Sequence, residues 1–429
     1  WKVPDRRKSS PNMTKAGNEW SDQVLTQIQR LNSFKLTKLQ LVLLGICLYI
    51  FLGLQHKTSK PHQPRIFHVT PKSIGDNSLL LEYMKRKKMV REVCEKYGAY
   101  TSKMKFLSAR RKIYKEEGIT PNELQNRLDE DTNIWASVKT SNWNQFIIQK
   151  KYHLGWCKVP KAASTSWSWI YLKLANVDEE KIKASSRQHA LLREIYPPQS
   201  EFLQKKSLPT CLKFMVVRHP FERLLSAYRD KLEDFDRDVK MRDGYYNVFY
   251  GKDIIKKYRK KDADPELLKR KSPTFPEFVQ YLAHSEPKTF DEHWKPVSHL
   301  CSPCHTVFDI ISKMETLVSD MEFIFGQTKV NLALPWAHTT NSSNSDVIEK
   351  YFSQLTRSDV MLLHKKYLLD FEMFDYSVDR YLDFAMDDEH GGANNSITNY
   401  GETEDTSEGV DSVKEWDVVD EEKQFAEVH

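Results

Sequence analysis

Residues suited to holding a negatively charged group stand close together between Tyr152 and Ala175. The segment reads YHLGWCKVPKAASTSWSWIYLKLA, in which an apolar strand is expected over 152–159 and a helix over 166–175. A turn of small residues lets the backbone approach a ligand, and the first amides and the dipole of a helix favour anions. We therefore predict an anion-binding loop whose residues are Pro160, Lys161, Ala162, Ala163, Ser164, Thr165 and Ser166. The alternative is an ordinary strand–helix connection with a lysine at its edge.

A second candidate site lies in the segment KFMVVRHPFERLLSAY. An apolar strand over 211–217 delivers Arg218 at its C-terminal end, and the helix that follows, over 221–232, carries Ser226. Strand ends at one edge of a parallel sheet line a common crevice, so Lys161 and Arg218 are expected to face the same pocket. The guanidinium group suits a second phosphate, and a helical serine can hydrogen-bond it. An arginine after a strand can also be a structural ion-pair partner.

The elements around these two segments alternate between strand and helix, which predicts an α/β fold with a P-loop-like, mainly parallel sheet flanked by helices. The Walker A pattern itself is absent from the sequence. Helical regions are also expected over 79–115 and 253–271, and further elements over 275–283, 318–326 and 346–370. Residues 121–143 read as a connecting segment.

An apolar run precedes this region. Residues 36–54 contain one charge, Lys38, and positive residues concentrate before the run rather than after it. A run of this length predicts a membrane-spanning signal anchor, and the charge bias puts the N-terminus in the cytoplasm. The expected organisation is a cytoplasmic tail (1–35), the anchor (36–54), a stem and helical lead-in (55–149), a single lumenal catalytic domain (150–385) and an acidic disordered tail (386–429).

Charge and cysteines fit a body that meets polyanions in an oxidising compartment. The net charge is +6, and acidic residues concentrate in the tail, which leaves a strongly basic body. Lumenal topology argues against nucleic acid as the partner. Five cysteines follow the anchor, so at least one is free or paired between chains, and the disulfide pairing stays open. Two glycosylation sequons begin at Asn341 and Asn394.

Together the two segments resemble the two 3′-phosphoadenosine-5′-phosphosulfate (PAPS) elements of the Golgi carbohydrate sulfotransferases, and specifically the chondroitin and dermatan 4-O-sulfotransferase subfamily. The resemblance runs from about residue 89 to 382 and includes EHWKPVSHLCSPC, KMETL and YLLDFEMFDYSVDRYL. It implies that Lys161, Ser164, Thr165 and Ser166 hold the 5′-phosphosulfate, and that Arg218 and Ser226 hold the 3′-phosphate. The family commonly has cysteine where Ser164 stands.

The resemblance implies a single-pass type II protein of the Golgi membrane. It would sulfate a sugar hydroxyl of a glycosaminoglycan or glycoprotein glycan, and the favoured position is the 4-hydroxyl of N-acetylgalactosamine in chondroitin or dermatan. A catalytically inactive Golgi protein that binds glycosaminoglycan is the alternative.

Sulfo transfer needs a base for the acceptor hydroxyl, and a histidine suits neutral pH. His189, between the two segments, is the favoured candidate and His293 is the second. A structural role for either histidine is an equally good interpretation. Arg187 is the favoured residue for the carboxylate of an acidic sugar. No metal is expected, since the sequence shows no cluster with metal-ligand spacing.

Overall fold

A four-stranded sheet forms the centre of the protein. The structure, a computed structural model, describes residues 74–185, 188–242, 244–332 and 344–388. The strands are β1 (Phe146–Gln149), β2 (Leu154–Cys157), β3 (Leu212–Val217) and β4 (Ile310–Lys313), in the order β1-β2-β3-β4. β1 pairs antiparallel with β2, whereas β2 with β3 and β3 with β4 are parallel. The predicted α/β class with a parallel sheet and flanking helices is thus confirmed.

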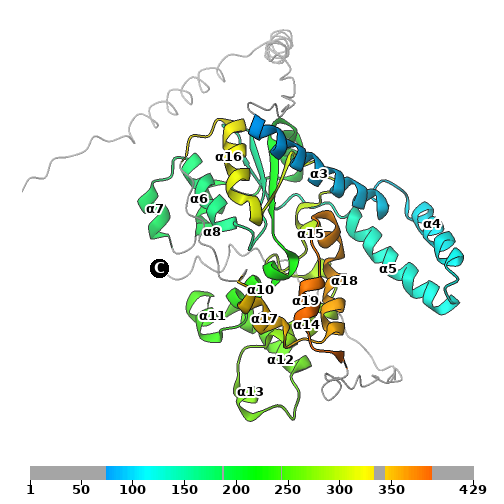
Figure 1. Ribbon diagram of the computed structural model, residues 1–429. Helices are drawn as coiled ribbons and strands as arrows, with labels where there is room; N and C mark the ends of the chain where they lie inside the picture. Colours follow the sequence, from blue (N-terminus) through cyan, green and yellow to red (C-terminus); the bar gives the residue numbers. More distant parts are fainter. Residues whose placement is uncertain (1–73, 186–187, 243, 333–343, 389–429) are drawn as a thin grey trace, which may run out of the picture. The chain divides into compact units, whose positions relative to one another are not determined.

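The sheet is surrounded by helices, as Figure 1 shows. Three helices precede β1 in the chain: α3 (Ile74–Lys96), α4 (Lys103–Glu116) and α5 (Pro121–Lys139). Between β2 and β3 come α6 (Ser164–Leu174), α7 (Glu179–Ala184), α8 (Gln188–Ile195), α9 (Glu201–Ser207) and the 3₁₀ turn η1 (Leu208–Thr210). After β3 follow α10 (Pro220–Lys231), α11 (Phe235–Arg242), the π-helical turn η2 (Asn247–Gly251), α12 (Lys252–Tyr258), α13 (Pro265–Lys269), α14 (Phe275–Ala283), η3 (Pro287–Thr289) and α15 (Val297–Cys301). After β4 come η4 (Met314–Thr316), α16 (Leu317–Thr328), α17 (Ser345–Phe352), α18 (Arg357–Met373) and α19 (Asp379–Phe384).

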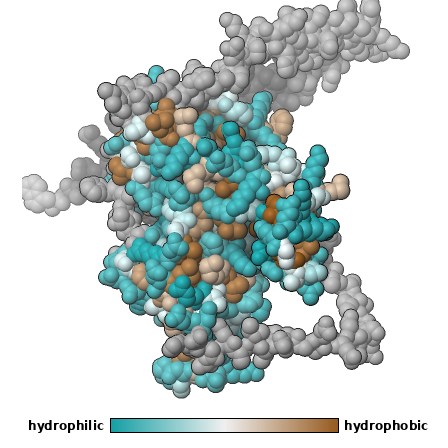
Figure 2. All heavy atoms as spheres, turned by 45° about the vertical axis from the view of Figure 1, so that its right-hand side comes forward, coloured by the Kyte–Doolittle hydropathy of each residue, from teal (hydrophilic) through white to brown (hydrophobic). Residues whose placement is uncertain are grey.

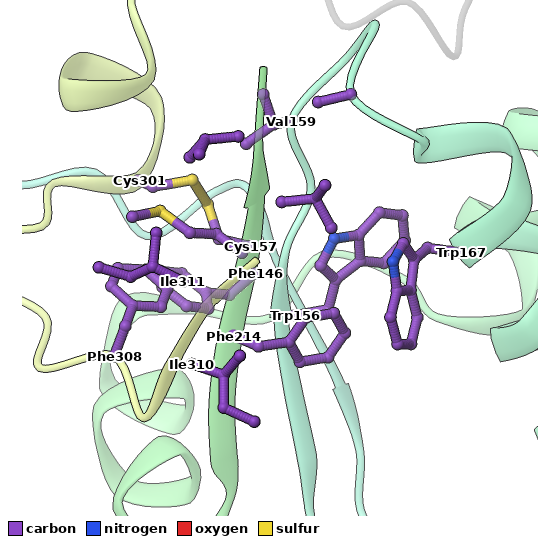
Figure 3. Close-up of a cluster of buried hydrophobic side chains, with 14 of the residues drawn as sticks. Phe146, Trp156, Cys157, Val159, Trp167, Phe214, Cys301, Phe308, Ile310 and Ile311 are labelled. Carbon is purple, nitrogen blue, oxygen red and sulfur yellow. A yellow bond between two sulfur atoms is a disulfide. The ribbon is translucent and has the colours of Figure 1, made fainter. Parts of the chain in front are cut away.

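The main hydrophobic core lies on both faces of this sheet. Side chains alternate between the faces along a strand, so that Trp156 packs against Trp167 of α6 on one face, with ring centroids 6.3 Å apart. On the other face Cys157 is joined to Cys301, beside Phe308 (Figure 3). Gly155 lies against η1, where an added Cβ would come within 2.8 Å of Leu208.

A second hydrophobic cluster gathers helices that follow β3. Side chains of α10, α14, α17 and α18 form it, among them Phe221, Phe278, Phe352 and Tyr367, and Figure 1 shows these helices grouped together. Since α10 begins directly after β3, this cluster fixes the helix that follows the predicted second phosphate element. On the face shown in Figure 2, hydrophilic residues predominate and hydrophobic ones form small groups.

Three local expectations were wrong. Residues 121–139 form helix α5 rather than a connecting segment, capped by Thr120 with Pro121 in the first turn. The expected helix over 253–271 is divided into α12 and α13. The expected helix over 79–115 is divided into α3 and α4, and Ser102 caps the start of α4. The region 346–370 consists of α17 and α18, since Thr356 and Asp359 form a capping box that starts the second helix.

Several predictions fall on residues outside the described ranges: the anchor, the cytoplasmic tail, both sequons, Arg187 and nearly all of the acidic tail. In the described part of the chain, no helix combines the length and the apolar character that crossing a membrane requires.

Candidate active site

The predicted anion-binding loop joins β2 to α6 and has an unusual backbone. Lys161 and Ala163 adopt positive φ angles of 67° and 53°, a conformation that costs a non-glycine residue about 1–3 kcal/mol and often marks a functional loop. Ala163 is the N-cap residue of α6. An alanine has no polar side chain with which to cap the first amides of the helix, so they suit an anionic ligand.

The structure brings Lys161 and Arg218 together at one edge of the sheet. β2 and β3 are parallel neighbours, with Cys157 opposite Met215, so the segments that follow them emerge side by side. Nη1 of Arg218 donates a hydrogen bond to the backbone carbonyl oxygen of Lys161 over 3.4 Å. The two candidate phosphate ligands therefore belong to one site.

Carboxylates of α10 pair with both cations. Nζ of Lys161 lies 3.1 Å from Oδ2 of Asp230, and Nε of Arg218 lies 3.4 Å from Oε2 of Glu222. Burial lowers the pKa of Lys161, an effect that Asp230 opposes. An arriving phosphate would compete with these carboxylates for the same two cations.

Asp230 is surrounded by positive charge. Besides Lys161, its carboxylate lies within 3.4 Å of Lys231, Arg237 and Arg242, and the contact to Arg242 is 2.7 Å. Burial raises the pKa of Asp230, but the surrounding cations outweigh this effect and hold it below its ordinary value. The cluster around Asp230 keeps an excess of positive charge next to the anion-binding loop.

His189, the first candidate base, is held by α6. Oγ of Ser168 lies 2.6 Å from the carbonyl oxygen of Ser164, which can only accept, so the hydroxyl proton points there. Nδ1 of His189, 3.1 Å from the same Oγ, must then be the donor, and Nε2 carries the lone pair. Burial, with Lys158 adding to it, lowers the pKa of His189 to about 4.

His293, the second candidate, has a carboxylate partner. Its Nδ1 lies 2.6 Å from Oδ1 of Asp291 and 3.2 Å from the hydroxyl of Tyr246. Burial lowers the pKa of His293, and Asp291 opposes this effect. The charge of His293 contributes to the lowered pKa of His189, and the charge of Lys231 lowers the pKa of both histidines. Since Lys231 also pairs with Asp230, both histidines lie close enough to the Asp230 cluster to be affected by its charges.

Arg223 connects the anion-binding loop to the segment around His293. Its fully buried guanidinium donates hydrogen bonds to three carbonyl oxygens, those of Pro160, Glu292 and Lys295, over 2.7–3.0 Å. The burial of Arg223 thus directs its charge to backbone carbonyl groups rather than to a ligand. It positions the anion-binding loop relative to the segment that carries His293.

Two disulfides and one free thiol account for the cysteines after residue 73. Cys157, at the end of β2, is joined to Cys301, and Cys94 is joined to Cys304. Cys211 is free and buried, which is one of the two outcomes that an odd number of cysteines allows. The Cys157–Cys301 bridge therefore joins the start of the anion-binding loop to the chain that follows His293.

The other predicted ligands have different surroundings. Ser164 is buried in the first turn of α6, Ser166 is half-buried and Thr165 is exposed; Ser226 is buried in the middle of α10. Asp230, Asp291 and Glu292 were not among the predicted site residues. The sequence did offer a signal for Glu292, which is the neighbour of His293 in the chain. In the structure, its carboxylate lies 4.0 Å from Nζ of Lys158. In the part of the chain that the structure describes, no three potential metal ligands gather.

The sequence of this chain is similar to those of known proteins of one family. A model of the sulfotransferase family matches residues 144–377. Human carbohydrate sulfotransferase 9 is 32% identical over 244 residues, which cover 54% of this chain and 53% of that protein. Rat carbohydrate sulfotransferase 11 is 31% identical over 245 residues, 55% of this chain and 68% of the relative. Human carbohydrate sulfotransferase 8 is 28% identical over 314 residues, which cover 70% of this chain and 64% of that protein. The chain thus spans between about half and two thirds of the length of these relatives. No solved structure matches.

Proposed function

This chain belongs to the sulfotransferase family, and from that premise we propose that it transfers a sulfo group from PAPS to a hydroxyl group of a carbohydrate. The relatives that it matches are named carbohydrate sulfotransferases, which supports a sugar as the acceptor. Among sugars, the resemblance noted in the sequence favours the 4-hydroxyl of N-acetylgalactosamine in chondroitin or dermatan.

The observation that carries the proposal is the contact of Arg218 with the anion-binding loop at Lys161. A nucleotide that carries phosphates on both its 3′ and 5′ oxygens would be held by two cationic side chains that lie close together, and this contact supports that arrangement. The α6 amides and Lys161 would bind the 5′-phosphosulfate, and Arg218 with Ser226 would bind the 3′-phosphate.

Lys161 has a further role in the reaction. As the acceptor oxygen forms its bond to sulfur, the bond between sulfur and the bridging phosphate oxygen breaks, and negative charge grows on that oxygen. A fixed cation and helix amides stabilise such charge strongly in a site shielded from water. PAPS supplies the sulfo group, and the protein supplies position and charge.

For the base, the partners of the two histidines favour His293 over His189. A base becomes positively charged when it takes the acceptor proton. Asp291 stabilises that charge on His293, whereas Lys158 disfavours it on His189. We therefore assign proton acceptance to Nε2 of His293 and give His189 a positioning role through Ser168.

A Golgi membrane location, with the catalytic domain in the lumen, is part of the proposal. It rests on the apolar segment 36–54 and its flanking charge. Two disulfides in the described residues fit an oxidising compartment and support it.

The test is a transfer assay with the full chain, labelled PAPS and three acceptors: desulfated chondroitin, desulfated dermatan and a glycan that ends in N-acetylgalactosamine. We expect labelled product, with chondroitin or dermatan preferred. Binding of 3′,5′-adenosine bisphosphate without transfer to any acceptor would reject this function. Failure of both binding and transfer would favour the inactive glycosaminoglycan-binding protein.

A further inference from the structure

Two aromatic side chains next to the candidate active site are exposed. Tyr245 and Phe249 lie with their ring centroids 4.7 Å apart, and 39% of Tyr245 and 62% of Phe249 are accessible to solvent. We call this pair the aromatic platform. Single exposed aromatic residues are common, but neighbouring ones that also have exposed apolar neighbours, here Val248 and Met241, often mark a binding surface.

The platform stands on a fixed piece of backbone. Phe249 belongs to the π-helical turn η2, a geometry frequent at functional sites. The buried carboxylate of Asp238 accepts hydrogen bonds from the backbone amide and the side-chain amide of Asn247, over 2.8 and 3.2 Å. These bonds hold the start of the turn against α11, so the exposed rings are carried on an anchored segment.

Tyr246 connects the platform to the proposed base. Its ring contacts that of Tyr245 edge to face, with centroids 5.1 Å apart, and its hydroxyl lies 3.2 Å from Nδ1 of His293. Nζ of Lys231 lies 4.8 Å from the centre of the Tyr246 ring, and the Arg242 guanidinium lies 5.7 Å from it. Both cations also contact Asp230, so the platform adjoins the same cluster that holds Lys161.

We propose that Tyr245 and Phe249 form an acceptor subsite, which stacks against a sugar ring next to the ring that is sulfated. Sugar rings present C–H groups on one face, and such groups suit the negative face of an aromatic ring. Lys231 and Arg242 supply positive charge nearby for the carboxylates of an acidic sugar chain. The chemistry of the surface thus matches a glycosaminoglycan, and this inference rests on the proposed function.

Steady-state kinetics with desulfated chondroitin test the subsite. In the doubly substituted Tyr245→Ala, Phe249→Ala chain, we expect the KM for chondroitin to rise about tenfold while kcat changes little, because stacking away from the reacting atoms binds ground state and transition state alike. The conservative Phe249→Tyr variant should keep the KM of the unchanged chain, and Phe249→Leu, which is apolar but not flat, should not.

Phe202→Ala provides the matched control, since this phenylalanine is also exposed, at 73%, and belongs to α9, which packs beside η1 and β1. It should leave the KM unchanged. Calorimetric titration with desulfated chondroitin and with 3′,5′-adenosine bisphosphate separates the outcomes. Weaker chondroitin binding with unchanged nucleotide binding supports the subsite, whether or not transfer is seen. An unchanged KM and chondroitin affinity, or an equal loss of nucleotide binding, would overturn it. Absence of transfer by the unchanged chain would instead count against the proposed function.

Discussion

Arg218 donates a hydrogen bond through Nη1 to the backbone carbonyl oxygen of Lys161, 57 residues earlier in the chain, over 3.4 Å. The bond joins the segments that follow two parallel strands, β2 and β3. Each cation also pairs with a carboxylate of α10, Lys161 with Asp230 and Arg218 with Glu222. Two loops and one helix thus form a single cationic site.

Removal of the Lys161 charge should slow transfer without unfolding the protein. We expect Lys161→Ala to lower kcat/KM about 10²- to 10³-fold, because charge on the leaving phosphate oxygen loses its cation. Asp230 keeps three other cationic partners, so thermal unfolding should change little. Lys161→Arg should retain part of the activity. Full activity of Lys161→Ala in the labelled-PAPS assay would remove the lysine from the mechanism.

The Asp230 cluster should matter for stability. Asp230→Asn leaves four cations without their common carboxylate, and we expect the free energy of unfolding to fall by about 3 kcal/mol. Chemical denaturation measures this loss. Glu222→Gln, which removes a carboxylate that pairs with Arg218, serves as the control and should cost less. Equal free energies of unfolding for the two variants would show that the Asp230 cluster stabilises the fold no more than the pair of Glu222 with Arg218 does.

The proposed base makes a prediction for the dependence of kcat/KM on pH. A base acts when unprotonated, so activity is complete above its pKa and falls as the pH drops through it. Burial lowers the pKa of His293 below its ordinary value of 6.5, so the acid side of the profile should have its midpoint below 6.5. Asp291→Asn removes the group that opposes this shift and should move the midpoint to still lower pH.

Single substitutions then distinguish the two histidines. His293→Ala should lower kcat about 10²- to 10⁴-fold, the usual loss for a general base. His189→Ala should have the smaller effect and keep the acid midpoint in place. If His189→Ala abolished the acid side of the profile and His293→Ala did not, His189 would be the base.

The bridge between Cys157 and Cys301 should stabilise the site as well as the fold. The two cysteines are 144 residues apart in the chain, and loss of a native disulfide costs about 2–5 kcal/mol. We expect Cys157→Ser to lower the free energy of unfolding by this amount and to weaken binding of 3′,5′-adenosine bisphosphate, since Cys157 lies only three residues before Pro160, where the anion-binding loop begins. Cys211→Ser, which alters the free buried thiol, is the control for substituting a buried cysteine and should leave nucleotide binding intact.

The parts of the fold that the sequence predicted are those with strong local signals. The apolar run before Arg218 became β3, and Pro220 began α10 as a first-turn proline should. The same kind of signal was present at α5, where Thr120, Pro121 and Glu123 mark a helix start, but the polar residues that follow obscured it. β1 and β4 are only four residues long, too short for a periodic pattern to stand out.

Most ion pairs of the site could not be predicted from the sequence, because they form between residues that only the fold brings together. Asp230 is an ordinary helix residue in the sequence. Lys231 is its neighbour on α10, but the fold brings the other three cations to it, Lys161 from the anion-binding loop and Arg237 and Arg242 from α11. Likewise, the partners of His189 and His293 decide which ring can hold a positive charge, and spacing along the chain does not reveal them. The disulfide pairing depends on contacts between residues 144 and 210 positions apart.

The most direct test of the two-cation site compares 3′,5′-adenosine bisphosphate with adenosine 5′-monophosphate, which lacks the 3′-phosphate, by calorimetric titration. The unchanged chain should bind the bisphosphate more tightly. Arg218→Ala should abolish that preference by weakening bisphosphate binding alone, at least about tenfold for a charge-assisted contact, and Lys161→Ala should weaken both ligands similarly. A preference that survives Arg218→Ala unchanged would contradict the placement of one nucleotide between these two residues.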